Sequence, residues 1–207
     1  MIPIVVYGAG GHGKVVAEIL VAGGHHLLAF IDDDPGRLGS AVLGLSVLPA
    51  SEWLRAHAPA HIALGVGANH DRERVACRIK ESGSKVLTLV HPGAIIARSA
   101  KIGEGSVIMP AAVLNPDCRI EDGVIVNTGA IVEHDVEVGH YAHLSPSSTI
   151  GGGTAIGAYA HIGIGASVLP SKRIGTNCII GAVAVVTEDI SDGQTAYGVP
   201  ARVRVRV

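Results

Sequence analysis

The sequence predicts an α/β domain with a small parallel sheet, followed by an all-β domain that forms a parallel β-helix. Up to about residue 90, short apolar runs alternate with helical stretches, and a glycine-rich turn follows the first run. From Ile96 onward an aliphatic residue recurs at every sixth position, a spacing that neither a helix nor a simple alternating strand produces. We therefore expect one domain over residues 1–90 and a second over 91–207.

The composition fits two folded domains and excludes several other classes of protein. Hydrophobic residues make up 48% of the chain and charged residues 16%, which allows a sizeable core and argues against disorder. The formal net charge of −2 provides no basic field for nucleic acid or a membrane surface. No apolar run reaches transmembrane length, and the first residues lack a signal-peptide pattern. The three widely spaced cysteines contain no CxxC pair, so we expect reduced thiols and a cytoplasmic location.

The first domain begins with a strand, a glycine turn and a helix. The apolar run 2–7 leads into the motif GAGGHG and then into a helical stretch from about Val15 to Gly23. A second strand over 27–31 ends in an acidic turn. Glycines let backbone amides approach a diphosphate at a helix N-terminus, and an acidic side chain at this distance accepts hydrogen bonds from ribose hydroxyls. The residues that we expect to bind a nucleotide here are Gly10, Gly11, His12, Asp32 and Asp33. The alternative is a glycine turn that serves packing alone.

Shorter elements complete the first domain. We expect a helix near 51–57, a strand over 62–64, a GVGAN loop that contains Gly67, a charged helix over about 71–82 and a last strand over 86–89. This alternation predicts a parallel sheet with helices on both faces. Only one mononucleotide-binding half fits before residue 90, whereas a dinucleotide fold normally needs two. We therefore expect the loop and Gly67 to hold a nucleoside diphosphate, such as the nucleotide end of a sugar nucleotide, and not NAD.

The second domain contains two registers with a period of six. Three hexapeptides would close a triangular coil of eighteen residues, with coils about 4.8 Å apart. In this coil both registers point inward, which explains why aromatic residues are only 3% of the chain. A mostly small residue stands two places before each aliphatic one, with Val124, Val136 and Lys172 as exceptions. The aliphatic series is Ile96, Ile102, Ile108, Leu114, Ile120, Val126, Val132, Val138, Leu144, Ile150, Ile156, Ile162, Val168, Ile174, Ile180 and Val186.

With these motifs the chain resembles the hexapeptide-repeat acyltransferases. Within them it is most similar to the bacterial sugar acyltransferases that carry an N-terminal Rossmann-like domain. The resemblance covers the whole chain and rests on the segments YGAGGHG, FIDDD, GVGAN, VIVNTGAIVEHDVEVG, HYAHLSP, IGIGASVLP and YGVPA. It implies a left-handed β-helix, acetyl-CoA as co-substrate and a role in polysaccharide or glycan biosynthesis.

The resemblance leaves more than one activity open. The family includes N-acetyltransferases of nucleotide-linked amino sugars and relatives of the sialic acid O-acetyltransferases. We expect an acetyl-CoA-dependent N-acetyltransferase of a UDP- or GDP-linked amino sugar. Sugar O-acetylation is the alternative, and a non-catalytic hexapeptide-repeat binding protein is the third possibility.

The densest polar cluster among the repeats is Glu133-His134-Asp135. His134 and Asp135 occupy the third and fourth places of their hexapeptide, which form a corner, so their side chains should project outward. Acyl transfer requires that the nucleophile lose a proton, and a histidine titrates near neutral pH. An adjacent carboxylate raises the basicity of the imidazole. We expect His134 to be the general base and Asp135 to assist it, as the resemblance also implies. The alternative is a pair of solvated corner residues.

The resemblance assigns further residues to acetyl-CoA. It places His143 against the thioester, Ile164 along the pantetheine arm, and Ala182 beside that arm through backbone groups. Asn127, on the strand before the polar cluster, is a candidate for hydrogen bonding to the sugar. His143 and His161 are eighteen residues apart and should stack on consecutive coils, but no role for His161 follows.

A zinc site is also conceivable, because four histidines lie in the repeats. Histidine ligation requires convergent rings with partners in the surrounding shell. Asp135 beside His134 fits a base better than a ligand triad, so we expect no metal. The histidines concerned are His134, His140, His143 and His161.

The C-terminal tail alternates valine with Arg202, Arg204 and Arg206. Two interpretations remain open. The tail forms an edge strand with one charged face, or one of its arginines binds a phosphate of CoA.

A triangular prism also presents flat faces that suit self-association. The outward residues Val107, Val113, Ile125 and Ile131 are apolar, and exposed apolar surface usually marks association. We expect a homotrimer with its active sites between neighbouring prisms, as the resemblance also implies.

Overall fold

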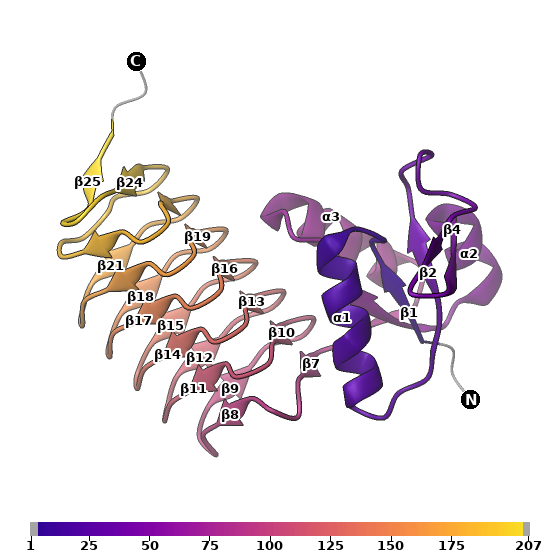
Figure 1. The fold of residues 1–207 in the computed structure, drawn as a ribbon, viewed down its shortest axis with the longest axis horizontal. Coiled ribbons are helices and arrows are strands. Elements are labelled where there is room, and N and C mark those ends of the chain that lie inside the picture. The colour runs from indigo at the N-terminus through magenta and orange to yellow at the C-terminus, as the bar shows by residue number, and fades with distance from the viewer. Residues whose placement is uncertain (1–3, 205–207) are drawn as a thin grey trace. The chain divides into compact units, whose positions relative to one another are not determined.

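The structure is a computed structural model that describes residues 4–204. It divides into two compact units between Pro92 and Gly93. The helices belong to the first unit, and the second is a stack of short strands (Figure 1). Residues 2 and 3 of the predicted first strand and Arg206 of the tail lie outside the described residues.

The first unit is an α/β layer structure around a mostly parallel sheet. Its strand order is β3-β4-β2-β1-β5-β6, and only the β3–β4 pair is antiparallel. Right-handed crossovers put α1 on one face of the sheet and α2 and α3 on the other, and Figure 1 shows α1 nearest the viewer. The elements are β1 (Ile4–Tyr7), α1 (Gly11–Ala22), β2 (Leu27–Asp32), β3 (Ala41–Val42), β4 (Leu45–Pro49), α2 (Ala50–His57), β5 (His61–Leu64), α3 (Asn69–Glu81) and β6 (Lys85–Val86).

Helix α1 begins four residues earlier than the sequence pattern predicts, inside the glycine motif. Gly10 is its N-cap and the chain is helical from Gly11. The glycines that discourage a helix are needed here for close packing. A Cβ on Gly13 would lie 1.9 Å from the carbonyl oxygen of Gly8, so no larger residue fits between the helix and the turn. The motif is therefore both a turn and the first turn of a helix.

The predicted strand over 86–89 is wrong, because two separate strands occupy this region. Strand β6 (Lys85–Val86) closes the first sheet, whereas β7 (Leu89–Val90) is not part of that sheet. Leu87 donates its amide to Ile62, at 2.9 Å, and the ladder with β5 ends there, although β5 itself continues to Leu64. The mostly apolar run 86–89 therefore looks like one strand in the sequence, whereas the chain leaves the first sheet within it.

The second unit is a left-handed parallel β-helix with three faces. Consecutive coils pair in parallel with an offset of eighteen residues, as in His143↔His161. We name each face after one central strand. The β16 face contains β10 (Val107–Ile108), β13 (Ile125–Val126), β16 (His143–Leu144), β19 (His161–Ile162) and β22 (Ile179–Ile180), with β24 (Thr195–Tyr197) and β25 (Arg202–Val203) at its end.

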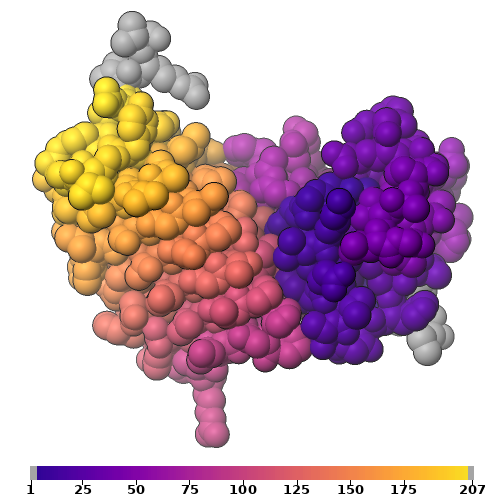
Figure 2. Space-filling model, in the orientation of Figure 1, coloured from indigo at the N-terminus to yellow at the C-terminus, as the bar shows by residue number. Residues whose placement is uncertain are grey.

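The other two faces are built in the same way. The β17 face contains β8 (Ile95–Ile96), β11 (Val113–Leu114), β14 (Ile131–Val132), β17 (Thr149–Ile150), β20 (Ser167–Val168) and β23 (Val185–Val186). The β18 face contains β9 (Lys101–Ile102), β12 (Arg119–Ile120), β15 (Glu137–Val138), β18 (Ala155–Ile156) and β21 (Arg173–Ile174). In the space-filling view the coils follow one another in chain order as bands of colour (Figure 2).

The two series of residues that recur every six positions fill the interior of the prism, as predicted. The aliphatic positions from Ile108 to Val186 are all buried, and Ile96 and Ile102 in the first coil are partly buried. The expectation of outward apolar surface is wrong for Val107 and Ile125, which are fully buried.

The remaining predictions for the chain as a whole concern cysteines and membranes. Cys77, Cys118 and Cys178 are all free thiols, and the last two point into the β-helix core. Within residues 4–204, no helix has the length and apolar character needed to cross a membrane.

Candidate active site

His134 and Asp135 lie at the corner between the β17 and β18 faces, which we call the His134 corner. Asp135 adopts the left-handed backbone conformation of the turn, with φ at +58°. Nδ1 of His134 lies 2.8 Å from Oδ2 of Asp135, and because a carboxylate only accepts, Nδ1 carries the proton. This hydrogen bond is the main cause that raises the pKa of His134 above its ordinary value, and the charges of Asp135 and Glu133 add to it. The Nε2 atom is then left as a basic lone pair on an exposed ring.

Gly152 stands at the same corner as His134, on the next coil. The third places along this corner are Arg98, Pro116, His134, Gly152, Pro170 and Glu188. A Cβ on Gly152 would lie 2.6 Å from both Cε1 and Nε2 of His134, so the imidazole ring rests directly against the glycine backbone. Nothing in the sequence singles out Gly152, because the contact depends on the stacking of coils.

Asn127 and His143 meet on the β16 face. The Asn127 Nδ2 atom lies 3.0 Å from Nε2 of His143, and Oδ1 of Asn127 accepts the amide of Thr128 at 2.8 Å. Because Oδ1 already accepts a bond, the amide NH₂ faces the ring, so Nε2 of His143 is an acceptor and Nδ1 carries the proton. The His143 and His161 rings lie 4.8 Å apart, as expected for consecutive coils, and Ser145 contacts Nε2 of His161 at 3.0 Å.

Ile164 and Ala182 lie at the corner between the β16 and β17 faces, which we call the Ile164 corner. They occupy the third place of their hexapeptides, after β19 and β22. Ile164 is 59% exposed. His134 belongs to a different corner of the triangular coil. A single chain therefore does not bring the predicted base and the predicted pantetheine contacts together.

The two aspartates of the first unit hold protein groups. The Asp32 carboxylate accepts a hydrogen bond from the backbone amide of Ala9 in the glycine loop, at 2.7 Å. It accepts a second one from the backbone amide of Asp34 in its own turn, at 2.9 Å. Asp33 accepts hydrogen bonds from Tyr7 and from Arg78, the latter at 2.5 Å. Burial and the hydrogen bond to Asp33 raise the pKa of Tyr7, which stays protonated. Asp32 thus fixes the shape of the loop in addition to any contact with a ribose.

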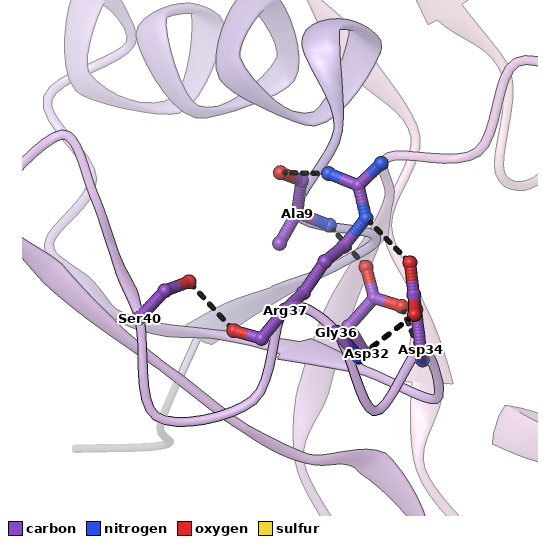
Figure 3. A network of polar contacts seen from close by, with 6 residues as sticks. All are labelled: Ala9, Asp32, Asp34, Gly36, Arg37 and Ser40. Atoms are coloured by element: carbon purple, nitrogen blue, oxygen red, sulfur yellow. Dashed lines mark hydrogen bonds and ion pairs between the residues drawn. The ribbon is translucent and has the colours of Figure 1, made fainter.

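Arg37 lies against the glycine loop, a position that its place in the sequence does not reveal. Its Nη1 donates to the carbonyl of Ala9 at 3.2 Å, and its Nε donates to Asp34 at 3.2 Å, as Figure 3 shows. The guanidinium lies 3.8 Å from where a Cβ of Gly10 would be, directly against the glycine loop. Of the five N–H donors of a guanidinium, these contacts use two. The signal in the sequence was the turn DDDPGR, which returns a cation to the loop.

The loop after β5 completes this end of the sheet. The fully buried Arg72 donates to the carbonyl of Gly67 at 2.7 Å and to Asn69 at 3.0 Å. Gly67 faces His12: a Cβ added to Gly67 would lie 3.9 Å from the Cβ of His12. Burial and, to a smaller extent, the charge of Arg72 lower the pKa of His12 to about 4. At neutral pH His12 is therefore an uncharged hydrogen-bonding group, whereas Arg37 is a cation.

A cavity opens beside these residues. It has a volume of about 350 Å³ and lies where β1, β2 and β5 end. Ligands of open α/β sheets bind at the carboxyl ends of the strands, where the chain switches direction in the sheet, which is between β1 and β5 here. Its lining consists of Tyr7, Gly8, Asp32, Asp33, Val66, Asp71, Arg74, Val75 and Arg78.

The histidines do not converge. In the part of the chain that the structure describes, no group of three or more His, Cys, Asp or Glu side chains could hold a metal ion. Nε2 of His140 lies 3.7 Å from Oε2 of Glu121. His140 follows β15, whereas the His134 corner precedes that strand.

Both units match known families. Residues 3–79 match the PglD N-terminal domain, and residues 99–134 match the bacterial transferase hexapeptide repeat. The chain is 40% identical over 109 residues to UDP-N-acetylbacillosamine N-acetyltransferase of Bacillus subtilis (strain 168), an alignment that covers 51% of this chain and 50% of that relative. The chain thus spans about half the length of this relative.

Solved structures match nearly the whole chain. A variant of perosamine N-acetyltransferase from Caulobacter crescentus, in complex with CoA and GDP-perosamine, is 36% identical, with a TM-score of 0.94 over 99% of this chain and 97% of that one. The acetyltransferase domain of PglB from Neisseria gonorrhoeae, in complex with acetyl coenzyme A, is 38% identical, with a TM-score of 0.91 over 98% of each chain.

Proposed function

Since the chain belongs to the family of hexapeptide-repeat nucleotide-sugar N-acetyltransferases with a PglD-type N-terminal domain, we propose that it transfers the acetyl group of acetyl-CoA to the amine of a UDP- or GDP-linked sugar. The observation that carries the proposal is the His134–Asp135 pair, a base with a raised pKa at a polar corner of the β-helix. The chemistry needs no metal: amine and thioester become amide and thiol.

In this reaction Nε2 of His134 accepts the proton that the amine nitrogen loses as it attacks the thioester carbon. Asp135 stabilises the imidazolium that forms, because its carboxylate already holds Nδ1–H. The carbon–sulfur bond then breaks, and the proton passes to the departing CoA sulfur. His143 is proposed to lie beside the thioester, with the Asn127 amide on its Nε2.

The nucleotide end of the substrate is proposed to bind the first unit. The amides of Gly10, Gly11 and His12 at the start of α1 attract the diphosphate, and the Arg37 guanidinium adds a positive charge beside them. The cavity at the strand ends, with Asp32, Asp33 and Gly67 around the same loops, is of a size that suits a small ligand.

The nature of the acceptor atom is tested by measuring CoA release with a panel of UDP- and GDP-linked sugars. Each amino sugar is paired with the analogue that carries a hydroxyl at the same carbon. We expect thiol release with the amino sugar alone. Release with the hydroxy sugar alone would replace this proposal by O-acetylation, and acetyl-CoA binding without release on any sugar would favour a binding protein.

The working unit is proposed to be a homotrimer with shared active sites. The separation of the His134 and Ile164 corners within one chain supports this, because a neighbouring prism can supply the missing corner. On the β17 face Ile95 is 66% exposed and Val113 and Ile131 are partly exposed, which leaves apolar surface for such a neighbour. The free thiols are compatible with a cytoplasmic location, which we also propose.

Shared sites predict complementation between inactive subunits. One variant carries His134→Ala and the other Ile164→Glu, and each is expected to be nearly inactive alone. After subunit exchange, mixed trimers regain sites that combine an intact His134 with an intact Ile164, so activity partly returns. Sites contained in one chain would give no recovery, and a fully active monomer in light scattering would contradict the trimer as well.

The pKa of His134 predicts the pH dependence of kcat. The base works when deprotonated, so a raised pKa places the acid limb of the profile above the ordinary histidine value of 6.5. Asp135→Asn removes the main cause of the shift. We expect its acid limb to move to lower pH and its plateau to fall, because a weaker base accepts the proton less readily. An unchanged acid limb, measured where chemistry limits the rate, would show that His134 is not the titrating base.

The first unit should respond to nucleoside diphosphates. We expect GDP or UDP, and not NAD, to raise the midpoint of thermal unfolding. Arg37→Ala should weaken nucleotide affinity by about tenfold, the usual effect of losing a charged hydrogen bond. Arg55→Ala, which removes an exposed cation on α2, serves as the matched control. Stabilisation by NAD alone, or equal losses in both variants, would contradict this site.

A further inference from the structure

Val183 stands at the Ile164 corner in an unfavourable backbone conformation. The fourth residue of a hexapeptide turns the corner with a positive φ, and at Val183 the angle is +59°. A β-branched side chain is poorly tolerated there, because its second branch crowds the backbone. Among residues 4–204, Val183 is the sole β-branched residue with a positive φ. The others in the β-helix are glycines and Ala111, Asp117, Asp135, Tyr141, Ser147, Tyr159, Ser171 and Asn177.

Burial does not compensate for this conformation. The Val183 side chain is 68% exposed, so within the chain it gains little from the hydrophobic effect. Its amide donates to the carbonyl of Ile164 at 2.8 Å, and its Cγ2 lies 3.9 Å from where a Cβ of Gly165 would be. Val183 and the exposed Ile164 thus form an apolar ridge over a glycine, although the fold itself would favour Gly or Asn at this turn. Strained residues of this kind are typical of ligand contacts.

The chemistry of the ridge indicates which part of a ligand it would hold. The residues at the third and fourth places of this corner, from the β16 coil onward, are all uncharged. They therefore suit neither the diphosphate of CoA nor its phosphorylated ribose. Their apolar surface suits an aliphatic, uncharged arm. They are Pro146, Ser147, Ile164, Gly165, Ala182 and Val183.

We propose that Val183 is a binding residue for acetyl-CoA. The two methyl groups of the Val183 side chain form, with Ile164, an apolar wall against the pantetheine arm of the ligand. This inference rests on the proposed function. The strain of a valine at this turn is then offset when the arm covers the side chain, and the residue contributes to affinity for the donor and not to the fold.

Val183→Asn tests this assignment, because asparagine relieves the turn, as at Asn177, and removes the apolar contact. In the full-length protein, calorimetry with CoA should show a dissociation constant about fivefold to tenfold higher, as expected for one or two uncovered methyl groups. The midpoint of thermal unfolding of the free protein should stay equal or rise. The matched control is Ser171→Val, with φ at +58° at another corner, which should lower that midpoint and leave CoA affinity unchanged.

An unchanged dissociation constant in Val183→Asn would overturn the proposal. So would weaker binding accompanied by a lower midpoint, or by a smaller particle in light scattering, because Val183 would then serve the fold or a contact between copies of the chain. The readout is separate from the proposed function: wild-type protein that binds CoA but acetylates no amino sugar refutes that function alone, whereas protein that binds no CoA refutes both.

Discussion

His134→Ala is expected to lower kcat by about a hundredfold to ten-thousandfold, the usual cost of removing a general base. The side chain is 64% exposed, hydrogen-bonds to Asp135 and lies against the Gly152 backbone, so the fold should be unaffected. Because His134 is proposed to act on the acceptor amine and not on the pantetheine arm, the affinity for CoA should be nearly unchanged. Steady-state rates and CoA calorimetry on the same preparation measure both quantities.

More than half of wild-type turnover, under conditions where chemistry limits the rate, would remove His134 from the mechanism. A sugar amine with a low pKa needs little help from a base, so the measurement is repeated on acceptors of different amine pKa. The loss should grow as the amine becomes more basic. His140→Ala serves as a control, because His140 is an exposed histidine of the same segment with a carboxylate, Glu121, nearby.

Gly152→Ala is expected to have the second largest effect, although no polar group is lost. A methyl group at this position would lie 2.6 Å from two atoms of the His134 ring, so the ring must move away from its present place against the glycine. A displacement of about 1 Å in a catalytic group can cost about a hundredfold in rate. We expect kcat to fall by about that factor, and the acid limb to move to lower pH as the bond to Asp135 weakens.

Gly153→Ser is the matched control for this substitution. Gly153 has φ at +67°, and the nearest atom to an added Cβ is 3.6 Å away, so a side chain fits there as it does at Ser171. This variant should keep nearly full activity. Equal losses in both variants would show that the coil tolerates no side chain in this region, and a normal rate in Gly152→Ala would show that the position of the ring is not important.

The fold was predictable because its signal repeats. The period of six is present in every coil, so single exceptions such as Lys172 do not obscure it, and the corner position of His134 follows from counting. The first unit was predictable in kind but less so in its boundaries. Helix α1 starts within the glycine motif because packing against Gly8 overrides the low helix propensity of glycine.

The site was predictable only where its residues are neighbours in one hexapeptide or in one register. His134 with Asp135, and His143 with His161, follow from spacing alone. The contact of Gly152 with His134, by contrast, depends on how two side-chain positions stack between coils. Arg37 was missed because a turn after β2 carries it back to the glycine loop. For the same reason the sequence could not reveal that Asp32 accepts the amide of Ala9.

The central claim is that the chain acetylates an amine on a nucleotide-linked sugar. The most direct test incubates the protein with acetyl-CoA and a UDP- or GDP-linked amino sugar, and analyses the nucleotide product by mass spectrometry before and after treatment with alkaline hydroxylamine. We predict that the product gains one acetyl group, that hydroxylamine does not remove it because it is an amide, and that His134→Ala forms it far more slowly. An acetyl group that hydroxylamine removes, or a nucleotide sugar that stays unmodified while the protein binds CoA, would contradict the claim.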